Sequence, residues 1–213
     1  MDLFDYMRET QQKESPLASR MRPKTLDEVV GQKHIIGKNT MLYRAIKADK
    51  LSSVIFYGPP GTGKTTLAMV IANTTSSEFT QLNATVAGKK DMEDVVKRAK
   101  DLQGMYGRRT ILFIDEIHRF NKGQQDYLLP FVEDGTIILI GATTENPYFE
   151  VNPALISRSI IFELHNLEKE DIKELIKRAV SDPVRGMGSY HAMLDDDAAE
   201  FLVMLQTVMH APH

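Results

Sequence analysis

The segment GPPGTGKT, residues 58–65, has the residue types and spacing of a phosphate-binding loop: two glycines separated by four residues and followed by lysine and threonine. Glycine lets successive backbone N–H groups point at one anion, and the N-terminus of a following helix adds its dipole. The lysine would neutralise the β- and γ-phosphates, and the threonine hydroxyl would bind Mg²⁺. The alternative is a Gly-Pro turn with a solvated lysine. The expected phosphate site comprises Gly58, Pro59, Pro60, Gly61, Thr62, Gly63, Lys64, Thr65 and Thr66.

Two acids, Asp115 and Glu116, follow the apolar run ILFI at residues 111–114. In open α/β sheets, ligands bind beyond the carboxyl ends of the strands. Asp115 can therefore hold a metal ion through its water shell, and Glu116 can polarise an attacking water. A strand end with two solvated acids is the alternative interpretation.

A third strand tip, IGATTEN, offers a hydroxyl to the same site. If its strand neighbours the one that ends at Asp115, then Thr143 or Thr144 would lie beside that acid. A hydroxyl there could contact the γ-phosphate or orient water. Two threonines at a strand end are also explained by β-propensity alone.

The elements that must position these residues form an alternating pattern. Strands are predicted within 52–58, 80–84, 108–118, 136–144 and the second half of 152–164. Helices are predicted within 39–51, 58–75, 91–103 and 124–135. Strands that are apolar on both faces and alternate with helices indicate a parallel sheet covered on each side. The predicted fold is therefore a three-layer α/β/α domain.

Beyond this domain the pattern becomes helical only. Helices are predicted at 166–180 and 194–205, joined by the turn-rich linker DPVRGMGSY at 182–190. The second of these helices has acids in its first turn, as the helix dipole favours. We therefore expect an N-terminal arm over 1–20, the α/β/α core over 21–165, and the start of a helical region over 166–202.

Composition narrows the possible functions. The chain has 213 residues, a net charge of -3 and no cysteine, which excludes disulfides, zinc-thiolate sites and thiol nucleophiles. The net charge provides no global basic field for nucleic acid, although a local patch remains possible. No apolar run reaches membrane-spanning length, and residues 1–17 carry acids where a signal peptide needs an apolar core. We expect a cytoplasmic protein without membrane contact.

The motifs GPPGTGKTT, LFIDEIHRFNK, GATTENP and ALISRS, in this order and spacing, resemble the AAA+ ATPases. Together with PLASRMRPKTLDEVVGQ, QQDYLLPFVEDG and YFEVNPA, they resemble specifically the replication-associated recombination protein A family. The resemblance covers roughly residues 15–202 and implies a P-loop AAA+ core followed by an incomplete helical lid. Clamp-loader subunits and the Holliday-junction branch-migration motor share the general motifs, but the phrase HRFNKGQQDYLLPFVEDGTI fits them less well.

The resemblance implies a role for each matching residue. Lys64 and Thr65 would be the Walker A lysine and threonine, and Asp115 and Glu116 would be the Walker B acids. Thr144 would be the sensor I threonine, and Arg158 an arginine finger acting in trans. Asn83 would be the polar residue that restrains the catalytic glutamate. Adenine would be held mainly by backbone and apolar contacts around Val29, Val30 and Gln32. Without the resemblance, an asparagine ending a strand is ordinary turn chemistry.

The residues alone indicate that Mg²⁺ and ATP are bound and ATP is hydrolysed to ADP. The resemblance implies more: a DNA-dependent ATPase of replication, recombination and repair that acts at stalled or gapped forks in the cytoplasm, associated with the nucleoid. Its implied partners are DNA forks, gaps and ends, single-stranded DNA-binding protein and further copies of the chain. The alternatives are a non-catalytic nucleotide-binding fragment and a clamp-loader or branch-migration subunit. Candidates for DNA or subunit contacts, or for a merely solvated surface, are Arg108, Arg109, Arg119 and Lys122.

The last residues, 203–213, do not continue the resemblance, which implies a sensor II segment N-G-D-A-R after Phe201. Their sequence is VMLQTVMHAPH. Suppose that the reading frame is shifted, so that each new codon is the third base of one codon followed by the first two bases of the next. Codons that this sequence permits from Val203 onward then yield D-A-A-N-G-D-A-R-A-A. The alanine read across Met209 and His210 is the one that every permitted choice of codons gives. We therefore expect 203–213 to be a frameshifted, non-native tail. A variable C-terminus is the alternative.

Overall fold

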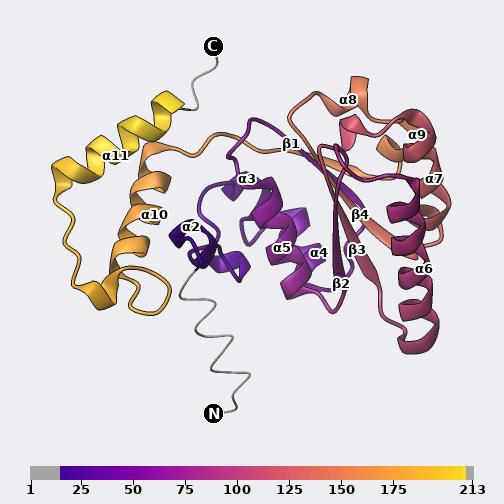
Figure 1. Ribbon diagram of the computed structural model, residues 1–213, viewed down its shortest axis with the longest axis horizontal. Coiled ribbons are helices and arrows are strands. Elements are labelled where there is room, and N and C mark those ends of the chain that lie inside the picture. Colours follow the sequence, from indigo (N-terminus) through magenta and orange to yellow (C-terminus); the bar gives the residue numbers. More distant parts are fainter. Residues whose placement is uncertain (1–14, 210–213) are drawn as a thin grey trace. The chain divides into compact units, whose positions relative to one another are not determined.

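The computed structural model describes residues 15–209, which divide into two compact units. One unit is Lys24–Asn166, and the other joins the chain up to Pro23 to the chain from Leu167 onward. Figure 1 shows the course of the chain through both units. All the residues predicted to do chemistry lie in the Lys24–Asn166 unit.

A five-stranded, all-parallel sheet forms the centre of the Lys24–Asn166 unit. Its strands, in the spatial order β2-β3-β4-β1-β5, are β1 (Val54–Tyr57), β2 (Glu78–Asn83), β3 (Thr110–Asp115), β4 (Ile137–Thr143) and β5 (Ile160–Glu163). The register places Ile114 of β3 opposite Gly141 of β4, and Tyr57 of β1 opposite Thr143. The parallel sheet is as predicted, and the tips of β3, β4 and β1 lie side by side.

Helices cover both faces of this sheet. They are η1 (Leu26–Glu28), α3 (Lys33–Ile36), α4 (Met41–Lys47), α5 (Lys64–Thr74), α6 (Lys89–Tyr106), η2 (Ile117–Arg119), α7 (Lys122–Glu133), α8 (Pro147–Glu150) and α9 (Pro153–Ile156). Figure 1 shows α4 and α5 on one side of the sheet and α6 and α7 on the other. The predicted three-layer α/β/α architecture is therefore confirmed.

Strand β3 shows why the strands are apolar on both faces. Ile111 and Phe113 pack in the cluster formed with α4 and α5, whereas Leu112 and Ile114 pack in the cluster formed with α6 and α7. All four side chains are fully buried. Because successive side chains of a strand point to opposite faces, a strand covered on both sides needs an uninterrupted apolar run.

The segment between β3 and α7 is closed by a capping box at Asn121. The Asn121 side-chain oxygen accepts the Gln124 N–H at 2.9 Å, and the Gln124 side-chain oxygen accepts the Asn121 N–H at 3.0 Å. Such reciprocal bonds satisfy two donors that a helix N-terminus otherwise leaves free. Residues 116–120 are therefore held between a buried strand and a capped helix.

The second unit is entirely helical among its described residues. It contains α2 (Leu17–Arg20), α10 (Lys169–Ser181), η3 (Gly188–Tyr190) and α11 (Asp196–Met209). The Arg20 guanidinium donates to the backbone carbonyl of Arg185 at 2.9 Å, so the segment before the core belongs to this unit. Helix α11 runs into the expected tail of 203–213, of which 210–213 lie outside the described residues, as do residues 1–14 of the expected arm. Within 15–209, no helix is long and apolar enough to cross a membrane.

Leu139 in the middle strand β4 offers a direct test of the two-sided core. Its side chain is fully buried among residues of the α6 and α7 layer. Leu139→Ala leaves a cavity in a close-packed layer, and we expect a loss of about 2–5 kcal/mol in the free energy of unfolding. Chemical denaturation followed by circular dichroism measures it. The control is Met105→Ala on α6, whose side chain is 72% exposed; its effect should stay within about 0.5 kcal/mol. Equal effects of both substitutions would contradict this packing.

Candidate active site

A glycine-rich loop connects β1 to α5. At Gly58 the backbone φ is +146°, and a Cβ atom there would lie 2.2 Å from the Leu164 carbonyl oxygen, so no other residue fits without a backbone shift. Gly63 has φ +94° and directly precedes the first residue of α5. Both positions need glycine because L-residues rarely adopt such angles. The loop therefore has the backbone that the phosphate-binding pattern predicts.

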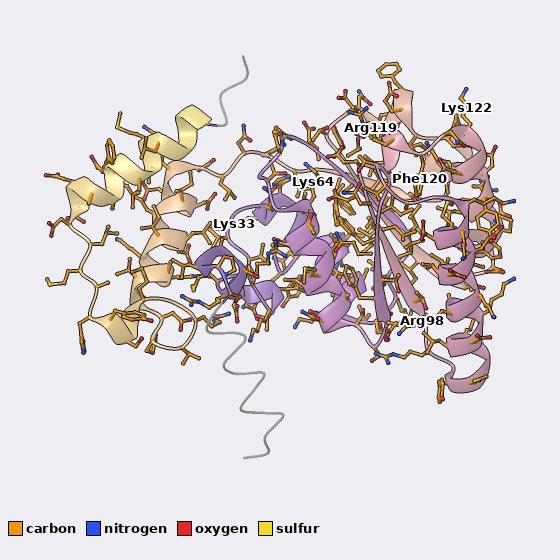
Figure 2. The ribbon with its side chains drawn as sticks, viewed as in Figure 1. Lys33, Lys64, Arg98, Arg119, Phe120 and Lys122 are labelled. Atoms are coloured by element: carbon orange, nitrogen blue, oxygen red, sulfur yellow. The ribbon has the colours of Figure 1, made fainter. Side chains whose placement is uncertain are left out.

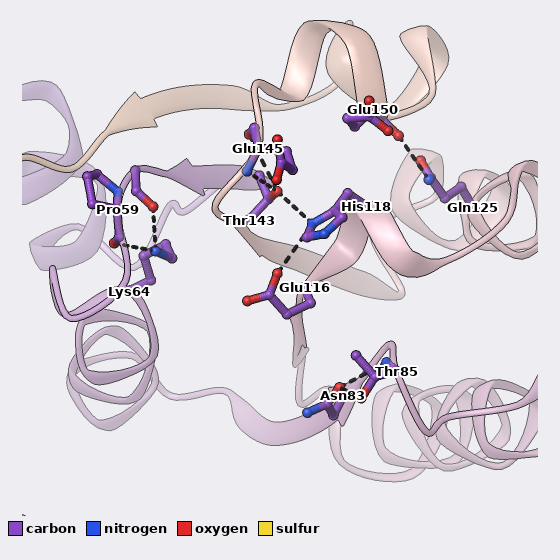
Figure 3. Close-up of polar contacts among 11 residues, drawn as sticks. Pro59, Lys64, Asn83, Thr85, Glu116, His118, Gln125, Thr143, Glu145 and Glu150 are labelled. Atoms are coloured by element: carbon purple, nitrogen blue, oxygen red, sulfur yellow. Dashed lines mark hydrogen bonds and ion pairs between the residues drawn. The ribbon is translucent and has the colours of Figure 1, made fainter. Parts of the chain in front are cut away.

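Lys64, the first residue of α5, is buried at the centre of this loop. Its ammonium donates to the carbonyl oxygens of Gly58 at 2.7 Å and Pro59 at 2.8 Å (Figure 3). Desolvation lowers the pKa of Lys64, and the nearby carboxylates of Glu116 and Asp115 oppose this shift. The lysine and the two strand-end acids thus share one electrostatic neighbourhood, as the two motifs require.

The first turn of α5 is suited to an anion. Gly63 occupies the N-cap position, and among the described residues no side chain caps it and no acid lies in the first turn. Thr62, whose hydroxyl donates to the Pro59 carbonyl at 2.9 Å, is buried, whereas Thr65 and Thr66 are half-buried. Backbone N–H groups at an uncapped helix N-terminus attract phosphate. Pro59, Pro60 and Gly61 are exposed at the loop surface.

Glu116 departs from the strand that carries it. Asp115 is the last residue of β3, and Glu116 then adopts a left-handed backbone with φ 55° and ψ 46°. A non-glycine residue in this region costs roughly 1 kcal/mol or more and is concentrated at functional sites. Its carboxylate consequently does not continue the alternation of β3, and its side chain stays about one-third exposed, at 33%.

Next to Glu116, a histidine and a threonine form a polar chain (Figure 3). His118 Nδ1 lies 3.4 Å from Glu116 Oε2 and 2.8 Å from Thr143 Oγ1. Thr143 is fully buried at the end of β4, whereas Thr144, the residue expected as sensor I, is exposed one position later. Of the two threonines considered from sequence, the inner one thus contacts the residues around Glu116 and the outer one faces solvent.

Gln32 ties the phosphate loop to the end of the unit. Its amide nitrogen donates to the carbonyls of Thr62 at 3.3 Å and His165 at 2.6 Å, and its oxygen accepts the His165 N–H at 3.0 Å. Gln32 is buried and left-handed, with φ 52°. Val30 is buried beside it in sequence, and Val29 packs on the α4 and α5 core. The predicted adenine segment therefore adjoins the phosphate loop through Gln32.

Two other predicted residues are engaged in local contacts. The Asn83 side-chain oxygen accepts the Thr85 N–H at 2.9 Å and the Thr85 hydroxyl at 2.7 Å (Figure 3). Asn83 stands in register with Asp115 on the neighbouring strand. Arg158, after α9, is exposed and forms an ion pair with Glu133 at the end of α7. It also donates to the Ala154 carbonyl at 2.9 Å.

The four basic residues considered as DNA or subunit contacts fall into two groups. Arg108 pairs with Glu78 at 3.3 Å, and Arg109 pairs with Asp49 at 2.6 Å, so both join segments next to the amino ends of strands. Arg119 and Lys122 are exposed around the start of α7, where Figure 2 shows Lys122 extending away from the ribbon. No ion pair of Arg119 or Lys122 is found within residues 15–209.

The described residues fit a magnesium ion that is shared with a nucleotide. They contain no group of three or more His, Cys, Asp or Glu side chains that could hold a metal by themselves. Magnesium is usually bound through one or two protein oxygens together with substrate phosphates and water. Thr65 in the first turn of α5 and Asp115 at the tip of β3 provide such oxygens beside the buried Lys64.

Two polar residues of this region have no role in the sequence-based prediction. Gln125 is buried, donates to the Phe120 carbonyl at 2.9 Å and accepts the Asn152 N–H at 2.7 Å, which fastens α7 to the segment before α9. His118 stands two residues after Glu116. Its place in the motif is the only available sequence signal, and spacing alone does not predict which side chain it contacts.

Comparison with known proteins agrees with this geometry. The family described as the Holliday junction DNA helicase RuvB P-loop domain matches residues 21–154. Replication-associated recombination protein A of Bacillus subtilis is 50% identical over 185 residues, which are 87% of this chain and 43% of that protein. Its Escherichia coli K12 counterpart is 47% identical over 190 residues, 89% of this chain and 42% of that protein.

A solved structure leads to the same conclusion. The RuvB Holliday junction branch migration motor of Thermotoga maritima superimposes with a TM-score of 0.69 at 34% identity, covering 86% of this chain and 59% of that one. The chain spans about two fifths of the length of the curated relatives it matches. With its five-stranded parallel sheet, P-loop lysine and strand-end acid pair, the chain belongs to the AAA+ P-loop ATPases and, among them, to the replication-associated recombination protein A family.

Proposed function

We propose that this chain binds Mg²⁺ and ATP and hydrolyses the nucleotide at the tips of β1, β3 and β4. One observation carries the proposal: the glycine-rich loop after β1 holds the buried Lys64 ammonium, and Asp115 and Glu116 stand at the end of β3 at the same edge of the parallel sheet, close enough to oppose the lowering of the Lys64 pKa. A desolvated cation beside two acids can bind polyphosphate while an acid stays close enough to activate water. The family of P-loop ATPases to which the chain belongs supports the same chemistry.

Each residue then has a physical task. Lys64 and the first N–H groups of α5 bind the phosphates, and Gln32 holds the Thr62 carbonyl so that the loop keeps its shape. A Mg²⁺ ion bound at Thr65 and Asp115 would neutralise charge on the phosphate oxygens. Glu116 accepts the proton of the attacking water as a general base. Thr144, exposed one position after the end of β4, would contact the γ-phosphate.

We further propose that the whole protein is a DNA-dependent ATPase of replication, recombination and repair that acts at stalled or gapped forks. The names of the relatives support this, as does the branch-migration motor with the same fold. In that protein the chain would work as a homo-oligomer, with DNA ends and single-stranded DNA-binding protein as partners. Arg158 would then leave Glu133 and reach the nucleotide of a neighbouring copy. A cytoplasmic, nucleoid-associated location follows from these partners.

The acid–lysine pair generates the first functional prediction. Glu116→Gln keeps the shape of the side chain but removes the base, so we expect ATP to bind with unchanged affinity while turnover falls about 10²- to 10⁴-fold. Lys64→Ala should abolish binding as well as turnover, because the phosphates lose their buried cation. Calorimetric ATP titration and phosphate release measure the two quantities.

A matched control distinguishes the loss of the general base from the removal of a negative charge elsewhere on the surface. Glu150→Gln neutralises an exposed acid on α8 and should change neither quantity. If the unaltered chain binds ATP but turns over no faster than Lys64→Ala, the hydrolysis proposal is wrong. The chain is then a nucleotide-binding module. A clamp-loader type role would instead show as turnover stimulated by a sliding clamp rather than by DNA forks.

The exposed cations at the start of α7 generate a prediction about DNA. Forked or gapped DNA should stimulate turnover, and the double substitution of Arg119 and Lys122 by alanine should weaken the stimulation by removing phosphate contacts. Lys97→Ala on α6 is the control, since Lys97 is also exposed. The loss should lessen as salt is raised, because counterion release drives such contacts. Equal losses in all variants would exclude a DNA contact at α7.

Arg158 can be tested by mixing variants. Chains with Lys64→Ala cannot use their own site but can offer Arg158, whereas chains with Arg158→Ala keep an intact site. In mixed oligomers an intact site can therefore meet an intact arginine from a neighbour. Phosphate release by the mixture should exceed the mean of the two variants measured separately. Turnover equal to that mean would contradict action in trans.

A further inference from the structure

Glu116 has a polar partner that neither its motif nor its strand requires. His118 sits on η2, two residues further along, and its side chain is only 9% exposed. Its Nδ1 atom lies within reach of both Glu116 Oε2 and Thr143 Oγ1, at 3.4 Å and 2.8 Å (Figure 3). The histidine therefore stands between the acid at the tip of β3 and the hydroxyl at the tip of β4.

Whether His118 Nδ1 carries a proton decides how the histidine interacts with the carboxylate and the hydroxyl. If Nδ1 carries its proton, the N–H donates to Thr143 Oγ1 and faces the Glu116 carboxylate, and both contacts are favourable. If Nδ1 is bare, it can accept the Thr143 hydroxyl proton, but its lone pair then faces the Glu116 carboxylate oxygens, which is repulsive. Since a neutral imidazole protonates one nitrogen only, its surroundings select the tautomer. The hydroxyl can serve either tautomer as donor or acceptor, so it is the carboxylate that favours the Nδ1–H form.

Thr143 makes this chain of contacts rigid. Its side chain is fully buried, and its Oγ1 also accepts the Glu145 N–H at 3.0 Å. Its backbone carbonyl accepts the Gly58 N–H at 3.2 Å, at the start of the phosphate loop. The Thr143 hydroxyl can donate its own proton to the Glu145 carbonyl oxygen, 3.4 Å away, which leaves an Oγ1 lone pair to accept the His118 Nδ1–H.

Another candidate for restraining Glu116, Asn83, makes no hydrogen bond with it in the described residues. The resemblance assigns that role to Asn83, but the oxygen of its side chain takes both Thr85 donors. Within the described residues, no hydrogen bond or ion pair joins Asn83 to Glu116. The restraint that the structure contains therefore comes from the loop after β3 and not from β2.

We propose that His118 is a positioning residue for Glu116: its Nδ1–H, donated to Thr143, lies 3.4 Å from one carboxylate oxygen and attracts it electrostatically, so that the other oxygen is directed at the attacking water. The inference rests on the hydrolysis proposed above. Without His118 the carboxylate can rotate about its side-chain bonds, while Lys64 and the phosphate loop are untouched. Loss of the histidine should thus affect the chemical step and spare nucleotide binding.

Turnover kinetics test this on the full chain. His118→Ala should lower kcat about 10- to 100-fold, since misplacing a reacting group by about 1 Å costs that much, with the ATP dissociation constant unchanged. His118→Asn returns an N–H near the Nδ1 position and should recover most of the loss. Asn83→Ala should cost less than His118→Ala. If His118→Asn is as slow as His118→Ala while melting temperature and ATP affinity are normal, the proposal is wrong.

A double-mutant cycle adds a second arm. Thr143→Val removes the hydroxyl at nearly constant volume, so its effect on kcat should largely vanish when His118 is already alanine. Additive effects would mean that the two residues act separately. A thermal melt of each variant verifies that it is folded.

Nitrogen-15 NMR of the imidazole decides the inference even if the chain does not hydrolyse ATP. The His118 resonances are assigned by their absence in His118→Asn. We expect a protonated Nδ1 in the unaltered chain; a neutral ring protonated at Nε2 would overturn the proposal. If Nδ1 is protonated and turnover is nil, the hydrolysis proposal fails while the arrangement of His118 stands.

Discussion

The parallel direction of β1, β3 and β4 constrains every group of the candidate site. Three neighbouring strands that run the same way must end at one edge, so Tyr57, Asp115 and Thr143 finish close together whatever follows them. The strands can run this way only because helices cover both faces, as the fully buried Phe113 and Leu139 show. The packing of the core and the assembly of the site therefore depend on the same requirement, a parallel sheet that helices cover on both faces.

That requirement explains why much of the fold could be predicted from the sequence. The run Ile111 to Ile114 has no polar face, and only a strand buried on both sides tolerates this. The loop was equally predictable, because a Cβ atom at Gly58 would lie 2.2 Å from the Leu164 carbonyl oxygen, and only a hydrogen atom fits in that space. Patterns of this kind reflect constraints that act within one segment of the chain, and such constraints can be inferred from residue types and their spacing along the sequence.

Contacts that a side chain makes with a distant segment left no such pattern. His118 reaches Thr143 across 25 positions, and Gln32 reaches His165 across 133. Sequence reasoning placed a threonine beside Asp115 but could not separate the buried Thr143 from the exposed Thr144, since one residue decides which way a side chain points at a strand end. The grouping of the segment around Arg20 with the helical unit was likewise not visible in composition.

The backbone of Glu116 connects these long-range contacts with chemistry. A left-handed residue is held there by a buried strand before it and a capped helix after it. The turn directs the carboxylate out of the strand alternation and toward His118, whose ring is buried beside Thr143. The same is true of Gln32, a second left-handed residue, whose amide reaches Thr62. Among the left-handed non-glycine residues, Gln32 and Glu116 are therefore the two whose side chains leave their own elements to meet the phosphate loop and His118, respectively, and both lie in the unit built on the buried sheet.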